Sequence, residues 1–407
     1  MTVSLAYGDV RLEVEIPEGV IVDSFDAARA PMNFGPVEFC ERALAANLDA
    51  HLDGDSLLVV VNDAYRHTPT ATVLTWLENL SPGVLNRAHF IIATGSHKPP
   101  NHEQLRSIFE RHHDSVYSRV TSHDATDQSS MRCLGTDSFG AAVYGDQRLF
   151  EFEKVLVIGS VEPHFFAGFT GGRKSIFPGL MDLASIERNH NLANSLDAAP
   201  LKLKGNPVSE HLDALLDLLP IDNIVSIQLV ADAHGGLAGA FIGDIRESFA
   251  QAVGLAEQIY SRKVKTRYDI ALCELLSPLN KNLYQAQKAL ENCQLAVANG
   301  GAAIVISPCL EGIGSGYFFH LAETWDRQTN APVDGVPRFG SHKLSRVNAL
   351  SRRIDVCIHS ELDDDVVRKV YFEPVRDVTA FVRDRTKGRS GARVAVVHDA
   401  GHTVLVT

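Results

Sequence analysis

Short segments with a continuous apolar core recur along the chain and alternate with amphipathic ones. Residues 57–62, 90–93 and 154–160 have the length of strands, whereas residues 73–77 and 105–109 carry apolar side chains at helical spacing. A strand without a polar face has to be buried on both sides, and helices provide that cover in a parallel sheet. The alternation therefore predicts an α/β fold with mainly parallel sheets.

A polar stretch at 261–269 separates two groups of such segments, and a new strand follows it at 270–275. The chain has 407 residues, which is enough for two or three cores of ordinary size. We therefore predict two α/β domains, 1–264 and 265–407, with an active-site cleft between them.

Three further segments have the pattern of paired strands. The first twenty residues alternate apolar and polar side chains, which predicts an antiparallel pair. Residues 220–243 predict two strands joined by a His-Gly-Gly turn. The last segment, 393–406, predicts a C-terminal strand pair.

The charge balance and the cysteines exclude several classes of protein. There are 38 basic and 50 acidic residues, and a net charge of −12 disfavours nucleic acid as a partner. The six cysteines show no C-x-x-C spacing, so reduced thiols in the cytoplasm are expected. No apolar run has the length of a membrane span, and the N-terminus lacks the apolar run of a signal peptide. We expect a cytoplasmic protein without a membrane partner.

A glycine-rich loop, residues 161–180, follows the strand at 154–160. Gly171 and Gly172 would allow backbone N–H groups to turn toward an anion. A phosphate-binding P-loop needs Gly before its Lys, but Arg173 precedes Lys174 here. A P-loop-like phosphate-binding enzyme and a lid that holds no phosphate both stay open. Lys174 is a candidate nucleophile, because a neighbouring cation lowers the pKa of a lysine.

Polar residues stand where the central strands end. Asp63 and Arg66 follow the strand at 57–62, and His97 follows the next strand. In such sheets, ligands bind beyond the carboxyl ends of the strands. Each residue alone could be a structural loop contact, but their clustering indicates a site.

Other candidates lie on predicted helices. Tyr284, Gln285 and Lys288 share one face of a helix start by their spacing, and a solvated helix face explains them equally well. His164 and His190 flank the glycine-rich loop. A lone helical histidine such as His190 is more often a surface or capping residue than a metal ligand.

Taken together, these motifs resemble the lactate racemase family that uses the nickel-pincer nucleotide. The resemblance spans most of the chain, and EPHFFAGFTGGRKSIFPG at 162–179 is its most specific part. D-x-x-R at 63–66, TGSHKP at 94–99, YQAQK at 284–288 and FGSHK at 339–343 accompany it. The family usually has Thr at the position of Tyr65 and Arg at the position of Lys98. Both changes fall at the mouth of the pocket, where they bear on which substrate is bound.

The resemblance implies a role for each candidate. The cofactor, a nickel-bearing pyridinium mononucleotide, would be covalently attached to Lys174 through a thioamide. His190 would be the nickel ligand, and imidazole beside sulfur suits Ni(II). The acid–base pair would be His97 and His164. The remaining assignments are cofactor binding by Gly171, Gly172, Asp63 and Arg66, and substrate binding by Arg66, Tyr284, Gln285 and Lys288.

The function so implied is the racemisation or epimerisation of a small 2-hydroxy acid by hydride transfer, which avoids a carbanion next to a carboxylate. Histidine suits the proton steps because its pKa lies near the working pH. The implied partners are the substrate and cofactor-synthesis proteins, and association into a homo-oligomer stays open. A non-catalytic cofactor-binding protein would keep Lys174 and His190 without needing His97 and His164.

Overall fold

The computed structural model describes residues 1–407 except 29–33, 67, 233–234, 315, 337 and 339. The chain forms two compact units, each built from separate segments. The central unit comprises residues 29–192 and 201–259, and the terminal unit comprises 1–28, 193–200 and 260–407.

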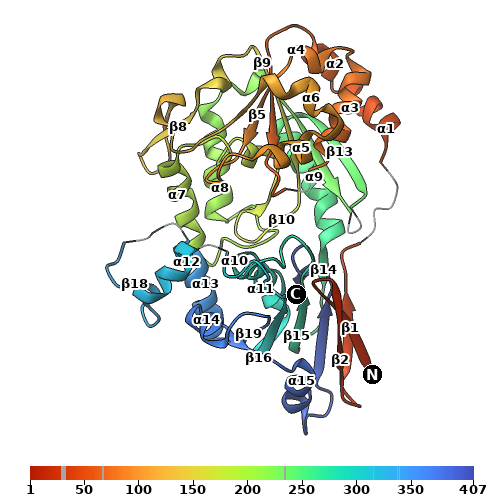
Figure 1. The fold of residues 1–407 in the computed structure, drawn as a ribbon, viewed down its shortest axis with the longest axis vertical. Coiled ribbons are helices and arrows are strands. Elements are labelled where there is room, and N and C mark those ends of the chain that lie inside the picture. Colours follow the sequence, from red (N-terminus) through yellow and green to blue (C-terminus); the bar gives the residue numbers. More distant parts are fainter. Residues whose placement is uncertain (29–33, 67, 233–234, 315, 337, 339) are drawn as a thin grey trace. The chain divides into compact units, whose positions relative to one another are not determined.

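The central unit contains a six-stranded sheet in the order β13-β12-β9-β4-β5-β6 (Figure 1). All neighbours pair in parallel except β12 and β13. The predicted strands are confirmed. The strands are β4 (Leu57–Asn62), β5 (His89–Ala93), β6 (Val120–Ser122), β9 (Lys154–Ser160), β12 (Ile224–Ala231) and β13 (Leu237–Asp244).

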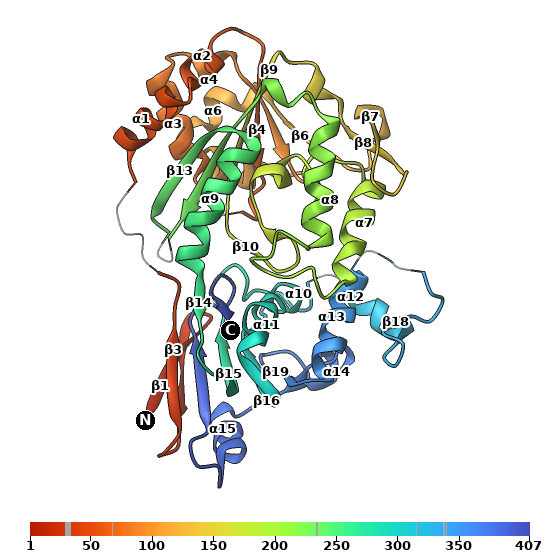
Figure 2. The same ribbon diagram turned by 180° about the vertical axis from the view of Figure 1, so that it is seen from behind.

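Helices cover both faces of this sheet, as the buried apolar side chains on both faces of its central strands require. One face carries α1 (Pro36–Ala45), α3 (Thr70–Leu80) and α5 (His102–Phe109), and the opposite view shows α8 (Pro207–Leu215) and α9 (Ile245–Tyr260) in front of the sheet (Figures 1 and 2). Smaller elements are α2 (Leu48–Leu52), α4 (Val84–Arg87), α6 (His113–Val116), α7 (Leu183–Asn191), β7 (Met131–Thr136), β8 (Ala142–Asp146), β10 (Pro163–His164) and β11 (Gly168–Phe169).

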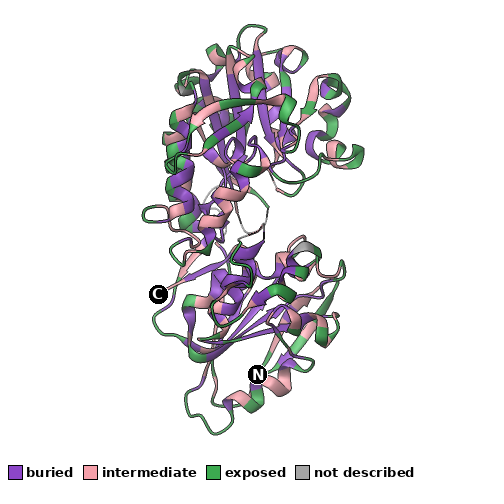
Figure 3. Cartoon of the chain, turned by 90° about the vertical axis from the view of Figure 1, so that its left-hand side faces the viewer, coloured by how far each residue is buried: buried purple, intermediate pink, exposed green. Residues whose placement is uncertain are grey.

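The terminal unit contains a second six-stranded sheet, in the order β20-β19-β16-β15-β21-β3, and all its neighbours are parallel. Its central strands are buried along most of their length (Figure 3). The strands are β3 (Ile21–Phe25), β15 (Tyr268–Glu274), β16 (Val297–Ile306), β19 (Asp355–His359), β20 (Glu373–Pro374) and β21 (Arg393–Val397).

Two layers cover this second sheet. Side chains of α10 (Leu283–Ala286), α11 (Lys288–Cys293) and α13 (Ser341–Ser351) share a core with one face. The hairpin of β1 (Thr2–Tyr7) and β2 (Val10–Glu15) packs with α15 (Val378–Thr386) against the other. Smaller elements are α12 (Gly316–Leu321), α14 (Asp364–Lys369), β14 (Ser261–Lys263), β17 (Trp325–Asp326), β18 (Ala331–Pro332) and β22 (Val404–Val406).

The segmentation of the chain differs from a single cut after residue 264. Strand β3 pairs with β21, with Val22 opposite Val394, so the N-terminal segment belongs to the terminal unit. The predicted C-terminal strand pair is wrong: β21 lies between β15 and β3, and β22 pairs with β14. The physical reason is that β21 is apolar on both faces and needs two neighbours in a covered sheet.

None of the described helices is both long enough and apolar enough to cross a membrane.

Candidate functional site

Three neighbouring strands of the central sheet, β9, β4 and β5, deliver the predicted site residues at their carboxyl ends. Asp63 follows β4, His97 follows β5, and His164 follows β9. Parallel neighbours end at the same edge of a sheet, so these residues belong to adjoining loops.

Asp63 and His97 form the tightest contact of the site. Nδ1 of His97 lies 2.6 Å from Oδ2 of Asp63, and the carboxylate is buried whereas the imidazole is about half exposed. The ring of Tyr65 meets that of His97 edge to face, with centroids 4.9 Å apart. An ionised carboxylate only accepts hydrogen bonds, so Nδ1 carries the proton and Nε2 the lone pair. His97 is thus oriented as a base at Nε2.

A chain of small polar side chains ties β4 to the glycine-rich loop. The amide of Asn62 donates to Oγ1 of Thr68 over 2.8 Å, and that hydroxyl lies 2.9 Å from Oγ of Ser160. Oγ of Ser175 donates to Oδ1 of Asn62 over 3.3 Å. None of these residues was predicted from the sequence, because single Asn, Ser and Thr residues carry no distinctive pattern.

Arg66 belongs to the same loop as Thr68, and its side chain is partly buried. Its Nη1 is 3.4 Å from Oε1 of Glu162, which is a partly solvated ion pair. Such a pair is worth little by itself. The Arg66 guanidinium can therefore leave Glu162 and bind another carboxylate or a phosphate instead.

The glycine-rich loop folds back on the sheet and does not form a phosphate cradle in the P-loop manner. The N–H of Gly172 donates to Oε1 of the buried Gln228 over 2.6 Å, and that of Lys174 donates to the carbonyl of Gly171. A 3₁₀ turn spans Gly172–Ser175, whereas a P-loop leads into a long helix.

The two glycines are explained by close packing. At Gly171, with φ of +77°, a Cβ would lie 2.5 Å from Cγ2 of Val161. At Gly172, with φ of +51°, it would lie 2.8 Å from the ring of Phe249. Both positions therefore exclude a side chain, and their role as cofactor-binding residues stays a prediction.

Arg173 attaches the glycine-rich loop to helix α8. Its buried guanidinium has Nε 2.8 Å from Oδ1 of Asp213 and donates from Nη2 to Oγ of Ser209 over 2.6 Å. The ring of Phe249 lies 4.6 Å away. Asp213 balances the charge of Arg173, so we assign Arg173 to anchoring the loop and not to activating Lys174.

Three candidate site residues lie around the ring of Phe166. Nζ of Lys174 lies 5.6 Å from its centroid. The imidazoles of His164 and His190 lie edge to face at 4.5 Å and 5.2 Å. The three polar residues were predicted from the sequence, but Phe166 was not. Phe166 is buried, and all three polar side chains lie near its apolar ring.

The tautomer of His164 differs from that of His97. The N–H of Ala167 donates to Nδ1 of His164 over 3.2 Å. Nδ1 therefore carries the lone pair, and Nε2 of the neutral ring carries the proton. His164 is oriented as a hydrogen-bond donor at Nε2.

His190 lies near the end of α7, which begins with Asp182 accepting from the N–H of Ser185. Its Nδ1 lies 2.9 Å from the carbonyl of Ile186, so Nδ1 carries the proton and Nε2 the lone pair. Burial, followed by the charge of Lys174, lowers the pKa of His190 to about 3. The ring is therefore neutral at ordinary pH, as a metal ligand must be.

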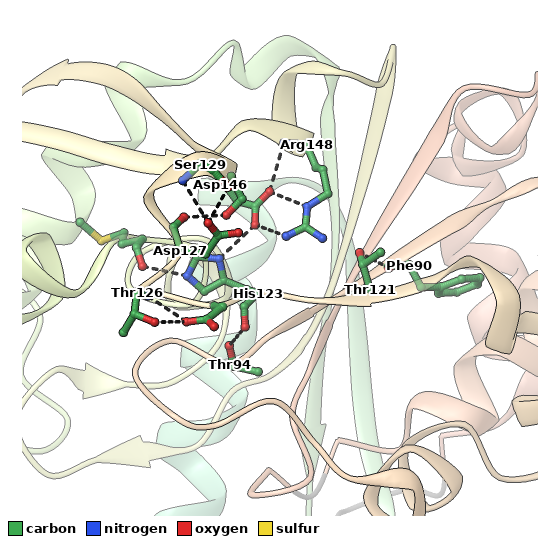
Figure 4. A network of polar contacts seen from close by, with 12 residues as sticks. Phe90, Thr94, Thr121, His123, Thr126, Asp127, Ser129, Asp146 and Arg148 are labelled. Carbon is green, nitrogen blue, oxygen red and sulfur yellow. Dashed lines mark hydrogen bonds and ion pairs between the residues drawn. The ribbon is translucent and has the colours of Figure 1, made fainter.

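A buried network connects Thr94, which precedes the loop of His97, with Met181, which precedes helix α7 (Figure 4). Oγ1 of Thr94 donates to the carbonyl of His123 over 2.7 Å, and Nε2 of His123 lies 2.8 Å from the carbonyl of Met181. Nδ1 of His123 is 3.0 Å from Asp146, which also pairs with Arg148. Burial alone would raise the pKa of Asp146, but these donors outweigh it and the net pKa is lowered.

The remaining candidates lie in the terminal unit. Tyr284 and Gln285 stand on α10 and Lys288 begins α11; the predicted continuous helix is divided near Gln287. Burial raises the pKa of Tyr284 to about 12, so the phenol keeps its proton. That these residues complete the same site as the central unit stays a prediction.

Comparison with known proteins shows which proteins the chain resembles. The model of the lactate racemase N-terminal domain matches residues 7–199, which include every candidate of the central unit. A lactate racemase of Lactiplantibacillus plantarum is 28% identical over 363 residues, covering 84% of this chain and 83% of that protein. The chain thus contains a lactate racemase N-terminal domain and is similar to a lactate racemase over 84% of its length. It is therefore an isomerase, of the racemase type.

Further comparisons extend this result along the chain. A lactate racemase of Thermoanaerobacterium thermosaccharolyticum is 24% identical over 349 residues, covering 82% of this chain and 79% of that protein. The structure of the lactate racemase apoprotein from that organism has a TM-score of 0.87 with full coverage of both chains at 21% identity. A Thermotoga maritima protein, 15% identical, has a TM-score of 0.70 over 93% of this chain and 100% of that chain. The two structural matches support the predicted α/β fold.

Proposed function

We propose that this racemase interconverts the enantiomers of a small, lactate-like 2-hydroxy acid, with a nickel-pincer nucleotide covalently bound to Lys174. The observation that carries the proposal is the grouping of Lys174, His164 and His190 around Phe166. The Asp63–His97 pair on the adjoining strand ends adds a base to this grouping.

The residues present fit such a cofactor. Lys174 supplies an amine for the covalent bond, and His190 supplies a neutral imidazole with its lone pair on Nε2. The described residues hold no group of three or more His, Cys, Asp or Glu side chains suited to a metal ion, so most ligands would come from the cofactor. When bound, the cofactor would supply a hydride acceptor for C2 of the substrate.

The chain's own residues handle the proton. His97 would take the hydroxyl proton at Nε2, and Asp63 would stabilise the imidazolium that results, 2.6 Å away. His164 would donate a hydrogen bond from Nε2 to the same oxygen. For the other enantiomer the two histidines exchange roles, which requires His164 to give up the bond from Ala167.

The substrate carboxylate needs a cation. We assign Arg66 to it, in exchange for its ion pair with Glu162, together with Lys288. Tyr284, protonated because burial raises its pKa, and Gln285 would donate hydrogen bonds. Lactate is the first candidate substrate because the named relatives are lactate racemases. The exposed Tyr65 beside His97 would contact the substituent on C2.

Two other functions are less well supported. In a P-loop-like enzyme the amides of the glycine loop would face a phosphate, but the N–H of Gly172 donates to Gln228. A non-catalytic cofactor-binding protein would not need a histidine oriented by a buried carboxylate, as His97 is by Asp63. Since the cofactor has to be made and attached, cofactor-synthesis proteins are the partners we propose.

The decisive experiment uses holoenzyme made in cells that synthesise the cofactor. Lactate deuterated at C2 should give the opposite enantiomer with most of its label retained in ordinary water. Proton abstraction would instead pass the label to a histidine that exchanges with solvent. Chiral chromatography with mass spectrometry measures both products, and rapid loss of deuterium would refute hydride transfer.

A further inference from the structure

Lys343 is a fully buried lysine on α13 to which the proposed reaction assigns no role. It is only 1% exposed. Its Nζ donates to the backbone carbonyl of Tyr284 over 2.7 Å and lies 4.2 Å from the centroid of the Tyr284 ring. Burying an amine is costly unless it is hydrogen-bonded, so these contacts define where Lys343 can be accommodated.

A second bond runs in the opposite direction. Nε2 of the buried Gln287 donates to the backbone carbonyl of Lys343 over 2.9 Å. One turn further along both helices, Nε of Arg346 lies 2.6 Å from Oε1 of Glu291, and this pair is buried as well. Side chains of α13 therefore hold α10 and α11 at consecutive turns.

The segment held in this way depends on outside support. Helix α10 has only four residues, Leu283–Ala286, and a helix this short is unstable by itself. Its start is capped by Asn282, which accepts from the N–H of Gln285 over 3.1 Å. The carbonyl of Tyr284 is the group that Lys343 holds. The place of Tyr284 is thus decided by tertiary bonds, among which is the one that Nζ of Lys343 donates to its carbonyl.

Lys343 also lies within electrostatic reach of Lys288. Burial, followed by the charge of Lys288, lowers the pKa of Lys343 well below its ordinary value. Lys343 therefore contacts Tyr284, and its pKa is lowered by the charge of Lys288; both are proposed substrate-binding residues.

We infer that Lys343 is a positioning residue, which sets the place of Tyr284 and Lys288 for binding of the substrate carboxylate. The inference rests on the proposed function for the identity of the anion. The clamp on the 283–293 segment does not depend on that function.

The test compares three variants of the holoenzyme. Lys343→Met keeps the length of the side chain and removes the donor. Gln287→Met removes the reciprocal bond. Thr386→Val is the matched control, because it removes a buried hydroxyl that donates to the carbonyl of Val382 over 2.8 Å in α15. Racemisation kinetics with lactate and hydrogen–deuterium exchange of peptides covering 283–293 are measured for each.

For Lys343→Met and Gln287→Met we expect faster exchange in 283–293. For Lys343→Met the KM should rise about tenfold with kcat within about twofold, because binding is weakened while the reacting groups stay in place. Thr386→Val should change neither. Exchange equal to that of the control would overturn the clamp, and a fall in kcat at constant KM would overturn the role in binding. If the wild type racemises no 2-hydroxy acid, the proposed function fails, and the exchange comparison still decides whether Lys343 holds the segment.

Discussion

Nδ1 of His97 lies 2.6 Å from Oδ2 of Asp63, and the carboxylate is buried while the imidazole is about half exposed. A buried carboxylate behind an exposed imidazole holds the ring in one tautomer and leaves its outer nitrogen for the substrate. We therefore predict that Asp63 affects catalysis by orienting His97, without contacting the substrate itself.

Asp63→Asn should therefore lower kcat by roughly two to four powers of ten, the range associated with general acid–base catalysis. The amide cannot stabilise an imidazolium and can hold the ring in the other tautomer. Racemisation rates measure the effect, and intact mass should show that Lys174 still carries the adduct. An activity close to that of the wild type would exclude the proposed role of His97 as the base.

We predict that mutation separates the proposed cofactor anchor, Lys174, from the proposed nickel ligand, His190. Lys174→Ala should abolish any covalent adduct, whereas His190→Ala should keep the adduct and lose nickel. Intact mass and metal analysis of the same samples report the two events independently. His112→Ala, at a half-exposed histidine outside the loop, should alter neither. An adduct that persists in Lys174→Ala would rule out the attachment site.

Crowding around Gly171 predicts a large effect of a single methyl group. Gly171→Ala would bring Cβ to 2.5 Å from Val161, in addition to the cost of φ at +77°. Gly140 has the same φ of +77°, but a Cβ there would meet no atom of the described residues within 4 Å, so Gly140→Ala carries only the backbone cost. Urea denaturation should show Gly171→Ala less stable than Gly140→Ala by about 1–3 kcal/mol. Equal losses would mean that the loop can relax around the added methyl group.

The buried Asp146 predicts a pH-dependent stability. Its pKa in the folded chain is lowered below the ordinary value of an aspartate by His123 and Arg148, which outweigh burial. Its contribution is therefore present above about pH 4, the ordinary pKa of an unfolded aspartate, and is lost as the pH falls through the folded-state pKa. Asp146→Asn should lower the free energy of unfolding by about 3 kcal/mol at pH 7, with a smaller difference near pH 3. Urea denaturation at several pH values tests this.

The control for that series is Asp127→Asn, since Asp127 is an exposed carboxylate whose side chain accepts hydrogen bonds from its near neighbour Ser129. It should change stability little at any pH. A gap between wild type and Asp146→Asn that is constant from pH 7 to pH 3 would show that the charge of Asp146 does not matter.

The sequence determined the local elements and the resemblance to lactate racemases. Continuous apolar cores such as 57–61 and 155–158 are typical of strands covered on both faces, so mainly parallel sheets were predictable. The motifs around His97, Lys174 and His190 were continuous in sequence, and they indicated this resemblance without tertiary information.

Only the tertiary structure decided which distant segments meet. Periodicity reports how a strand is buried but not its neighbours, so the pairing of β3 with β21 and of β22 with β14 could not be predicted. The same holds for Phe166, Gln228 and Lys343, whose roles depend on contacts with residues far along the chain. Local propensity acts over a few residues, whereas a buried polar group is satisfied by whichever segment the packed core brings within hydrogen-bonding distance.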